Sequence, residues 1–282
     1  MVEDRPWLTV FAHAVLILGA LVLAFPLWVA FVASTQSAAD FNRIPMALLP
    51  GGHFVENYST VLSQGLASAG AVPVATMMLN SLVMALFIAV GKIAISLLSA
   101  YAIVYFRFPF RKFIFWMIFI TLMLPVEVRI LPTYQVVASL GMLNSYGGLA
   151  IPLIASATAT FLFRQYFLTI PEELLEAARL DGAGPWRFFR DVLLPLSRTN
   201  IAALFVILFI YGWNQYLWPL LITTDPSYYT IVMGIQRMVT VADATPQWQL
   251  VMATVILALL PPVVVVVAMQ RLFIRGLVET EK

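Results

Sequence analysis

Six long apolar runs divide this chain and limit what it can fold into. A helix of about 20 apolar residues crosses the hydrocarbon core of a bilayer, which is about 30 Å thick. The second run is longer than a span requires, and Gly91-Lys92 is only a weak break in it, so we expect one long helix. The sequence predicts an all-α polytopic membrane protein with six transmembrane helices and a single domain, its spans at Val10–Ala33, Ala75–Phe106, Phe113–Pro132, Leu143–Phe163, Asn200–Ile222 and Leu250–Ile274.

Charged side chains are too scarce for a soluble enzyme. They make up 11% of the 282 residues, while 62% are hydrophobic, and ordinary globular proteins carry about 25% charged residues. The formal net charge of +2 provides no basic face of the kind that binds nucleic acid, so no nucleic-acid partner is expected. Without cysteine and with only two histidines, the chain is expected to hold no metal.

The distribution of basic residues predicts the orientation in the membrane. With six spans and a cytoplasmic N-terminus, twelve of the 16 lysines and arginines fall in cytoplasmic segments, three fall on the opposite side, and Lys92 lies within a span. An odd number of spans would destroy this separation. We therefore expect both termini in the cytoplasm, a cytoplasmic loop at 164–198 and an external loop at 223–249.

The loop at 164–198 concentrates charge, with 10 of the chain's 30 charged residues. Pro171 suits the first turn of a short helix that Gly182 would end, and Pro185 would start a second piece that Pro195 would end. Each piece has an apolar face. Such helices lie in the lipid interface or dock on a partner, and a structured loop without a partner is the third interpretation.

One motif in this loop resembles a known family. Glu176-Ala177-Ala178, Gly182 and Val192-x-Leu194-Pro195 match the EAA loop of bacterial ABC import permeases at every spacing, two spans from the C-terminus. The similarity covers essentially the whole chain and is to the carbohydrate-uptake branch, the relatives of the maltose permeases. Within that branch the chain resembles permeases of sn-glycerol-3-phosphate importers at Arg5–Thr9, Met123–Arg129 and Tyr211–Tyr216.

This resemblance implies a type I ABC importer permease fold in the bacterial cell inner membrane. A second homologous permease subunit would complete the pathway, two ATP-binding cassette subunits would use ATP and Mg, and a periplasmic solute-binding protein would deliver the solute. The chain shows no Gly-x-x-x-x-Gly-Lys-Ser/Thr phosphate loop, so it would bind no cofactor and would not be an enzyme. The joint to the ATPase would consist of Glu176, Ala177, Ala178, Asp181, Gly182, Leu194 and Pro195.

Polar residues at membrane depth are candidate solute contacts, because a charge there is costly unless it is paired or hydrated. Lys92 is the leading candidate, since its ammonium would suit a phosphate-bearing solute. A structural ion pair or snorkelling toward the interface are the other interpretations. Trp213 and Trp218 would either line a path or be interfacial aromatics. The further candidates are Asn80, Glu127, Arg129, Asn214, Gln215 and Tyr216.

The sequence thus predicts a permease subunit of an ATP-driven importer for sn-glycerol-3-phosphate or glycerophosphodiesters. The alternative solute is a neutral sugar or oligosaccharide. A transporter driven by an ion gradient is disfavoured because the spans hold almost no carboxylates. An intramembrane enzyme is disfavoured because no Ser/His or paired His/Asp site lies at membrane depth.

Overall fold

The computed structural model describes residues 6–41, 47–121, 124, 126–240 and 245–279, without side-chain detail at 6, 126, 127, 271 and 273–279. Every regular element in these ranges is a helix, which confirms the all-α prediction. The helices of nine or more residues are α1 Pro6–Ser34, α3 Phe54–Ser63, α4 Val74–Tyr105, α5 Arg111–Ile120, α6 Val126–Ser139, α8 Ala157–Phe167, α9 Glu172–Leu180, α12 Arg198–Trp213, α14 Ile231–Val239 and α15 Trp248–Glu279. The shorter pieces are α2 Ala38–Phe41, α7 Tyr146–Ala150, α10 Pro185–Phe188, α11 Leu194–Leu196 and α13 Leu217–Ile222, with tight turns at Ala67–Ala69, Ile151–Leu153 and Pro226–Tyr228 and a π-helical turn at Phe189–Leu193.

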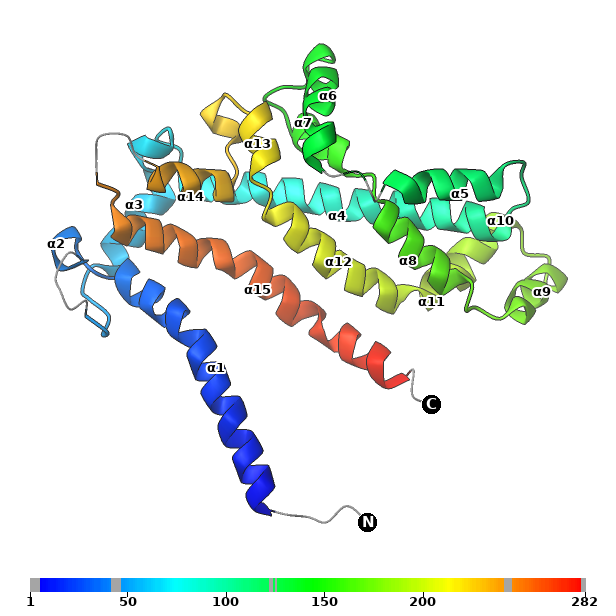
Figure 1. Ribbon diagram of the computed structural model, residues 1–282, viewed down its shortest axis with the longest axis horizontal. Helices are drawn as coiled ribbons and strands as arrows, with labels where there is room; N and C mark the ends of the chain where they lie inside the picture. Colours follow the sequence, from blue (N-terminus) through cyan, green and yellow to red (C-terminus); the bar gives the residue numbers. More distant parts are fainter. Residues whose placement is uncertain (1–5, 42–46, 122–123, 125, 241–244, 280–282) are drawn as a thin grey trace. The chain divides into compact units, whose positions relative to one another are not determined.

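The chain forms two compact units, and two helices pass from one unit into the other. The first unit comprises Met1–Ala75 and Gly234–Leu259, and the second comprises Thr76–Met233 and Leu260–Lys282. Helix α4 enters the second unit near its own start, and α15 crosses between the units near its middle. Figure 1 shows both as unbroken helices, α4 in cyan and α15 in orange to red.

Hydrogen bonds to the end of α1 organise the first unit. The Asn57 side chain, which is buried on α3, donates to the carbonyls of Ser34 and Gln36, both at 2.9 Å. The hydroxyls of Tyr58 and Ser34 lie 2.9 Å apart. These bonds satisfy carbonyls that a helix end leaves without partners inside the helix. The rest of α1 exposes apolar side chains along most of its length, as a helix in contact with lipid does.

Close helix packing builds the second unit, which contains the candidate sites. A Cβ added at Gly212 of α12 would lie 2.8 Å from the Cα of Ala85 on α4, so only glycine permits this approach. A core of Met84, Ile88, Leu149, Trp218 and Ile222 lies beside this contact. The structure shows no break at Gly91-Lys92, and α4 is one helix as expected. Gly91 instead lets Ile154 approach, since an added Cβ would lie 2.7 Å from its side chain.

The helices reproduce some of the expected spans and divide others. In the described ranges Trp7–Ser34, Val74–Tyr105 and Trp248–Gln270 are long and apolar enough to cross a membrane, and two bent pairs raise the count to five if each pair is one span. The pairs are Tyr146–Leu153 with Ala157–Phe167, bent by 48°, and Pro185–Leu196 with Arg198–Trp213, bent by 71°. The expected span Phe113–Pro132 is divided between α5 and α6, and Asn200–Ile222 is interrupted at Asn214–Tyr216. Six spans and cytoplasmic termini stay predictions.

Candidate functional site

A small cavity in the second unit collects polar side chains from several elements. Its volume is about 120 Å³. Ligand pockets for drug-sized molecules are about 300–1,000 Å³, so this cavity suits one small group, such as a phosphate. Lys92 lines it from α4, Arg129 and Thr133 from α6, Tyr211 from the last turn of α12, and Gln215 from the segment that follows α12. The remaining lining residues are Ile130, Pro152, Leu153, Ala155, Leu217 and Trp218.

Lys92 is the most buried charged group of this cavity, with 7% of its surface exposed. Its Nζ lies 3.8 Å from the centre of the Tyr211 ring, a cation–π contact. In the part of the chain that the structure describes, the ammonium has neither a carboxylate partner nor a hydrogen bond. Because an ammonium over a ring directs N–H toward its electron-rich face, the remaining donors are those that have no acceptor among the described residues and are available to an anion.

Arg129 adds a second positive charge to the same cavity. No Asp or Glu occurs among the described residues that line it, so the two cations repel each other without compensation from the wall. Gln215 donates to the Tyr211 carbonyl at 3.1 Å, and Thr133 donates to the Arg129 carbonyl at 2.7 Å. The Gln215 side-chain oxygen is therefore an acceptor that a solute hydroxyl can use. The cavity combines two cations with neutral polar groups, which is the chemistry of an anion site.

Tyr211 and Thr133 are cavity residues that the sequence interpretation missed. Each lies four positions from a predicted candidate, Tyr211 before Gln215 and Thr133 after Arg129. Residues four apart share a helix face. The four-residue spacing is therefore the signal from which Tyr211 and Thr133 were predictable in the sequence.

The other predicted solute contacts lie elsewhere. Asn80 is fully engaged, because its amide donates to the carbonyls of Ser227 and Tyr229 and accepts from the Tyr146 hydroxyl. Asn214 and Tyr216 lie in the break between α12 and α13, where they cap the two helices, and they are not among the residues that line the cavity. Glu127 belongs to α6, but its side chain lies outside the described part of the chain.

The two tryptophans of this region are buried rather than interfacial. Trp213 exposes 2% of its surface and Trp218 exposes 4%. The Trp218 indole donates to the Gly148 carbonyl at 3.0 Å and belongs to the core beside the cavity. An aromatic residue at the membrane interface would leave this N–H to water or headgroups. The interfacial interpretation was wrong for both.

The EAA segment forms a helix with a glycine-dependent end. Gly182 has a φ of +72°, its N–H donates to the Arg179 carbonyl at 3.0 Å, and the Ala183 N–H donates to the Ala178 carbonyl at 2.8 Å. This pair of bonds is the Schellman arrangement that ends α9. Pro171 precedes the helix instead of lying in its first turn.

The side chains of α9 divide between a buried and an exposed set. The apolar face expected for this helix, Leu174, Leu175 and Ala178, is only partly buried: Ala178 is buried and Leu175 half-buried, while Leu174 is exposed. Glu176, Ala177 and Asp181 are exposed, and Leu180 exposes 89% of its surface. No ion pair joins Glu176 to Arg179 in the described chain, so both charges stay available to a partner.

Aromatic side chains at the end of α4 hold the segment that follows α9. The Tyr101 hydroxyl donates to the Pro185 carbonyl at 2.7 Å, and its ring lies 5.0 Å from that of Phe189. The Tyr105 ring meets Phe188 edge-on at 5.3 Å. Because these contacts are buried and directional, α4 and the segment 185–189 form one packed piece.

Leu194 and Pro195 occupy a different position from the α9 residues. Pro195 lies near the end of a continuous helical run, Pro185–Leu196, which ends one residue after the position expected from the sequence. Both residues line an apolar groove together with Phe205 of α12 and Met269 of α15.

The sequence profile of the family described as "Binding-protein-dependent transport system inner membrane component" matches residues 92–279, which include the cation cavity, α9 and α11. The chain belongs to this family. It is an inner-membrane ABC permease, a transport subunit and not an enzyme.

Curated relatives match this permease from end to end. The sn-glycerol-3-phosphate transport system permease protein UgpE of Agrobacterium fabrum (strain C58) is 61% identical over 282 residues, covering 100% of both chains. The proteins of the same name from Rhizobium meliloti (strain 1021) and Escherichia coli O1:K1 are each 60% identical over 282 residues, again with full coverage of both chains.

A solved structure shares the fold of this permease. A chain of a bacterial ABC transporter involved in the import of the acidic polysaccharide alginate superposes with a TM-score of 0.80 at 21% identity. The match covers 96% of the present chain and 98% of the other. It confirms an ABC importer permease fold.

Proposed function

We propose that this permease is one subunit of an ATP-driven importer for sn-glycerol-3-phosphate and forms half of the translocation pathway. The observation that carries the proposal is the meeting of Lys92 and Arg129 in one small cavity without a carboxylate among its described lining residues. The names of the full-length relatives support the same solute. A glycerophosphodiester has the same anionic group and falls within the same proposal.

The cavity would receive the phosphate of the solute. The free donors of Lys92 form a compact point charge, and the Arg129 guanidinium supplies a planar fork that fits two phosphate oxygens. Gln215 and Thr133 would face the glycerol hydroxyls. A neutral sugar would leave two cations without an anionic partner among the described lining residues, so the alternative solute is disfavoured.

The EAA segment would transmit the ATPase cycle to this cavity. Exposed Glu176, Ala177, Asp181 and Leu180 would enter a cleft on an ATP-binding cassette subunit, with small Ala177 allowing close approach. The buried contacts of Tyr101 and Tyr105 support the transmission of movement from 185–189 into α4, which carries Lys92. Leu194 and Pro195 of α11, which line the apolar groove, would also contribute to this contact with the ATPase.

The assembly would contain a second homologous permease, two ATPase subunits that bind ATP and Mg, and a periplasmic solute-binding protein. Six spans with both termini in the cytoplasm would place the loop 164–198 on the ATPase side. The loop 223–249 would then meet the binding protein. The Asp225 carboxylate in that loop accepts hydrogen bonds from the Ser227 N–H and hydroxyl, which lower its pKa and order the turn.

Uptake by the reconstituted assembly tests this proposal. The complete transporter with its binding protein, in proteoliposomes, should accumulate radiolabelled sn-glycerol-3-phosphate when ATP is present on the ATPase side and should not accumulate maltose. Uptake of maltose in preference to the phosphate ester would refute the solute. Uptake that proceeds without ATP would refute the class of transporter.

A further inference from the structure

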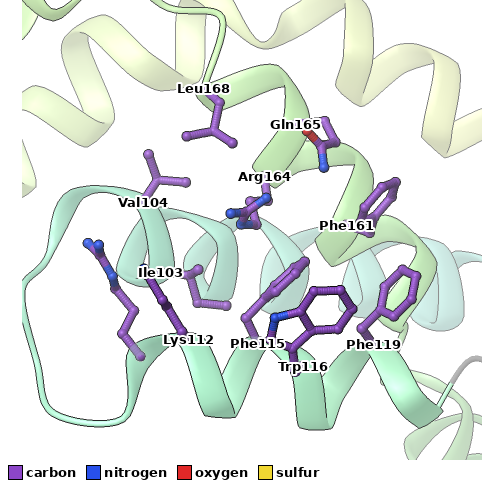
Figure 2. A pocket seen from close by; sticks show the side chains of 11 residues that line it. Ile103, Val104, Lys112, Phe115, Trp116, Phe119, Phe161, Arg164, Gln165 and Leu168 are labelled. Carbon is purple, nitrogen blue, oxygen red and sulfur yellow. The ribbon is translucent and has the colours of Figure 1, made fainter.

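A second basic cavity lies between α5 and α8, apart from the Lys92 cavity. Its volume is about 430 Å³. Figure 2 shows side chains of α5 and α8 facing each other across it, with Ile103 and Val104 from the end of α4. None of the residues that line this cavity lines the Lys92 cavity.

Three positive charges line the α5–α8 cavity: Arg111, Lys112 and Arg164. No Asp or Glu occurs among its lining residues, all of which the structure describes. Arg111 donates to the Phe106 carbonyl at 3.2 Å. Lys112 has no hydrogen bond or ion pair in the described chain. The three positive charges are therefore not neutralised by any residue that lines the cavity.

Arg164 carries the strongest indication of a missing partner. Its Nε is buried and has no hydrogen-bond partner within the described residues. Its guanidinium lies 4.2 Å from the centre of the Phe115 ring, and Figure 2 shows the group pointing from α8 toward α5. A buried donor without an acceptor is unfavourable. An anion in the cavity would satisfy this donor.

The other walls of the cavity are apolar and lead outward to lipid. Phe115, Trp116, Phe119 and Phe161 form them. The outer face of α5 is more than half exposed at Phe113, Trp116, Met117 and Ile120. In an inner-membrane protein, exposed apolar side chains of this kind contact acyl chains. The cavity thus offers cations at one end and an apolar wall continuous with the bilayer, which fits an amphiphile with an anionic head.

We propose that the α5–α8 cavity binds an anionic glycerophospholipid, with its phosphate against Arg164 and Lys112 and its acyl chains along α5. Basic pockets between transmembrane helices bind lipid headgroups in this manner. A soluble phosphate would need only the cations, and the aromatic wall and the exposed face of α5 favour the lipid. The bound lipid would join α5 to α8, the helix that leads into α9.

Lipid retention by the complete transporter complex provides the first test. The complex is purified in detergent with equal amounts of phosphatidylglycerol and phosphatidylcholine, and retained lipid is counted by native mass spectrometry. The Lys112→Gln/Arg164→Gln variant should lose affinity for phosphatidylglycerol by roughly thirtyfold, from the removal of two cations. Arg190→Gln/Arg198→Gln is the matched control, because both arginines are exposed, both line another groove, and the change removes the same two positive charges. Undiminished phosphatidylglycerol retention in the double variant would overturn the proposal.

Tryptophan fluorescence gives a test that does not depend on the basic variants. Trp116 lines the cavity, and the chain has seven tryptophans, so the difference between wild type and Trp116→Phe isolates its signal. Phosphatidylglycerol with brominated acyl chains should quench this signal more strongly than brominated phosphatidylcholine. Equal quenching by the two lipids would overturn an anion-selective site. Loss of quenching upon addition of millimolar inorganic phosphate would also overturn it, by assigning the cavity to a soluble anion.

Discussion

Lys92 and Tyr101 lie nine residues apart on α4, and each contacts a different element. The Lys92 ammonium lies 3.8 Å from the Tyr211 ring of α12, and the Tyr101 hydroxyl donates to the Pro185 carbonyl at 2.7 Å. Nine residues of helix span about 14 Å. A single stiff helix thus connects the cation cavity to the segment after the EAA helix.

The charge of Lys92 should matter for solute affinity. A hydrogen bond to a charged group contributes about 1.5–3 kcal/mol, so we expect Lys92→Gln to raise the KM for sn-glycerol-3-phosphate uptake by about tenfold or more. Lys92→Arg keeps the charge and should retain more of the affinity. Uptake kinetics in proteoliposomes measure both. An unchanged KM in Lys92→Gln would contradict the role of this residue as a phosphate ligand.

Tyr211 should stabilise Lys92 through its ring and not through its hydroxyl. A desolvated cation–π contact contributes about 2 kcal/mol, so Tyr211→Leu should destabilise the complex by about that amount, while Tyr211→Phe should cost much less. Thermal unfolding in detergent measures the difference. When Lys92 is already replaced by Met, the additional Tyr211→Leu change should cause no further destabilisation, because the cation–π pair is already broken. Equal losses in the Phe and Leu variants would show that the ring face is not the important feature.

Gly182 should be required for coupling because of its backbone conformation. At a φ of +72° any side chain is strained, although nothing lies within 4 Å of an added Cβ. Gly182→Ala should cost about 1–2 kcal/mol at the end of α9 and reduce ATP-driven uptake severalfold. Gly184→Ala is the matched control, since Gly184 has a φ of −69° and equally free surroundings. Equal uptake by the two variants would show that the conformation of Gly182 is not required for coupling.

Gly212 should be required for the packing of α12 against α4. An added Cβ would lie 2.8 Å from the Ala85 Cα, so the backbones must move apart. Overpacking of this kind costs about 1–3 kcal/mol. Gly212→Ala should therefore lower the melting temperature of the purified complex. Gly19→Ala in α1, where an added Cβ meets nothing within 4 Å, is the control and should leave it unchanged. If the Gly212→Ala and Gly19→Ala complexes have the same melting temperature, the close approach at Gly212 is not needed for stability.

Local chemistry made several elements predictable from the sequence. The 32 residues of α4 form one helix because no strong turn signal interrupts an apolar run. Helix α9 ends at the glycine that the spacing singled out, because Gly182 adopts a φ that other residues resist. The family resemblance was also present in the sequence, because the EAA spacing is a local pattern.

The interruptions within the apolar runs were not predictable in the same way. Asn214–Tyr216 breaks a run that reads as one span, and α5 and α6 divide another. Hydropathy averages over a window, so it does not register where an apolar helix bends. The burial of Trp218 against Gly148 was equally invisible, since an indole N–H finds its acceptor only in the packed structure.

The sequence alone determined that this chain is a helical membrane protein, that it carries an EAA segment, and that Lys92 is a costly charge within an apolar run. Periodicity, hydropathy and motif spacing depend on neighbours along the chain, and they suffice for these conclusions. Only the tertiary structure decided that Lys92 shares a cavity with Arg129 and Gln215 while Asn80 is engaged in structural hydrogen bonds. Those partners are tens of residues apart, and their proximity depends on how α4, α6 and α12 pack, which no local pattern encodes.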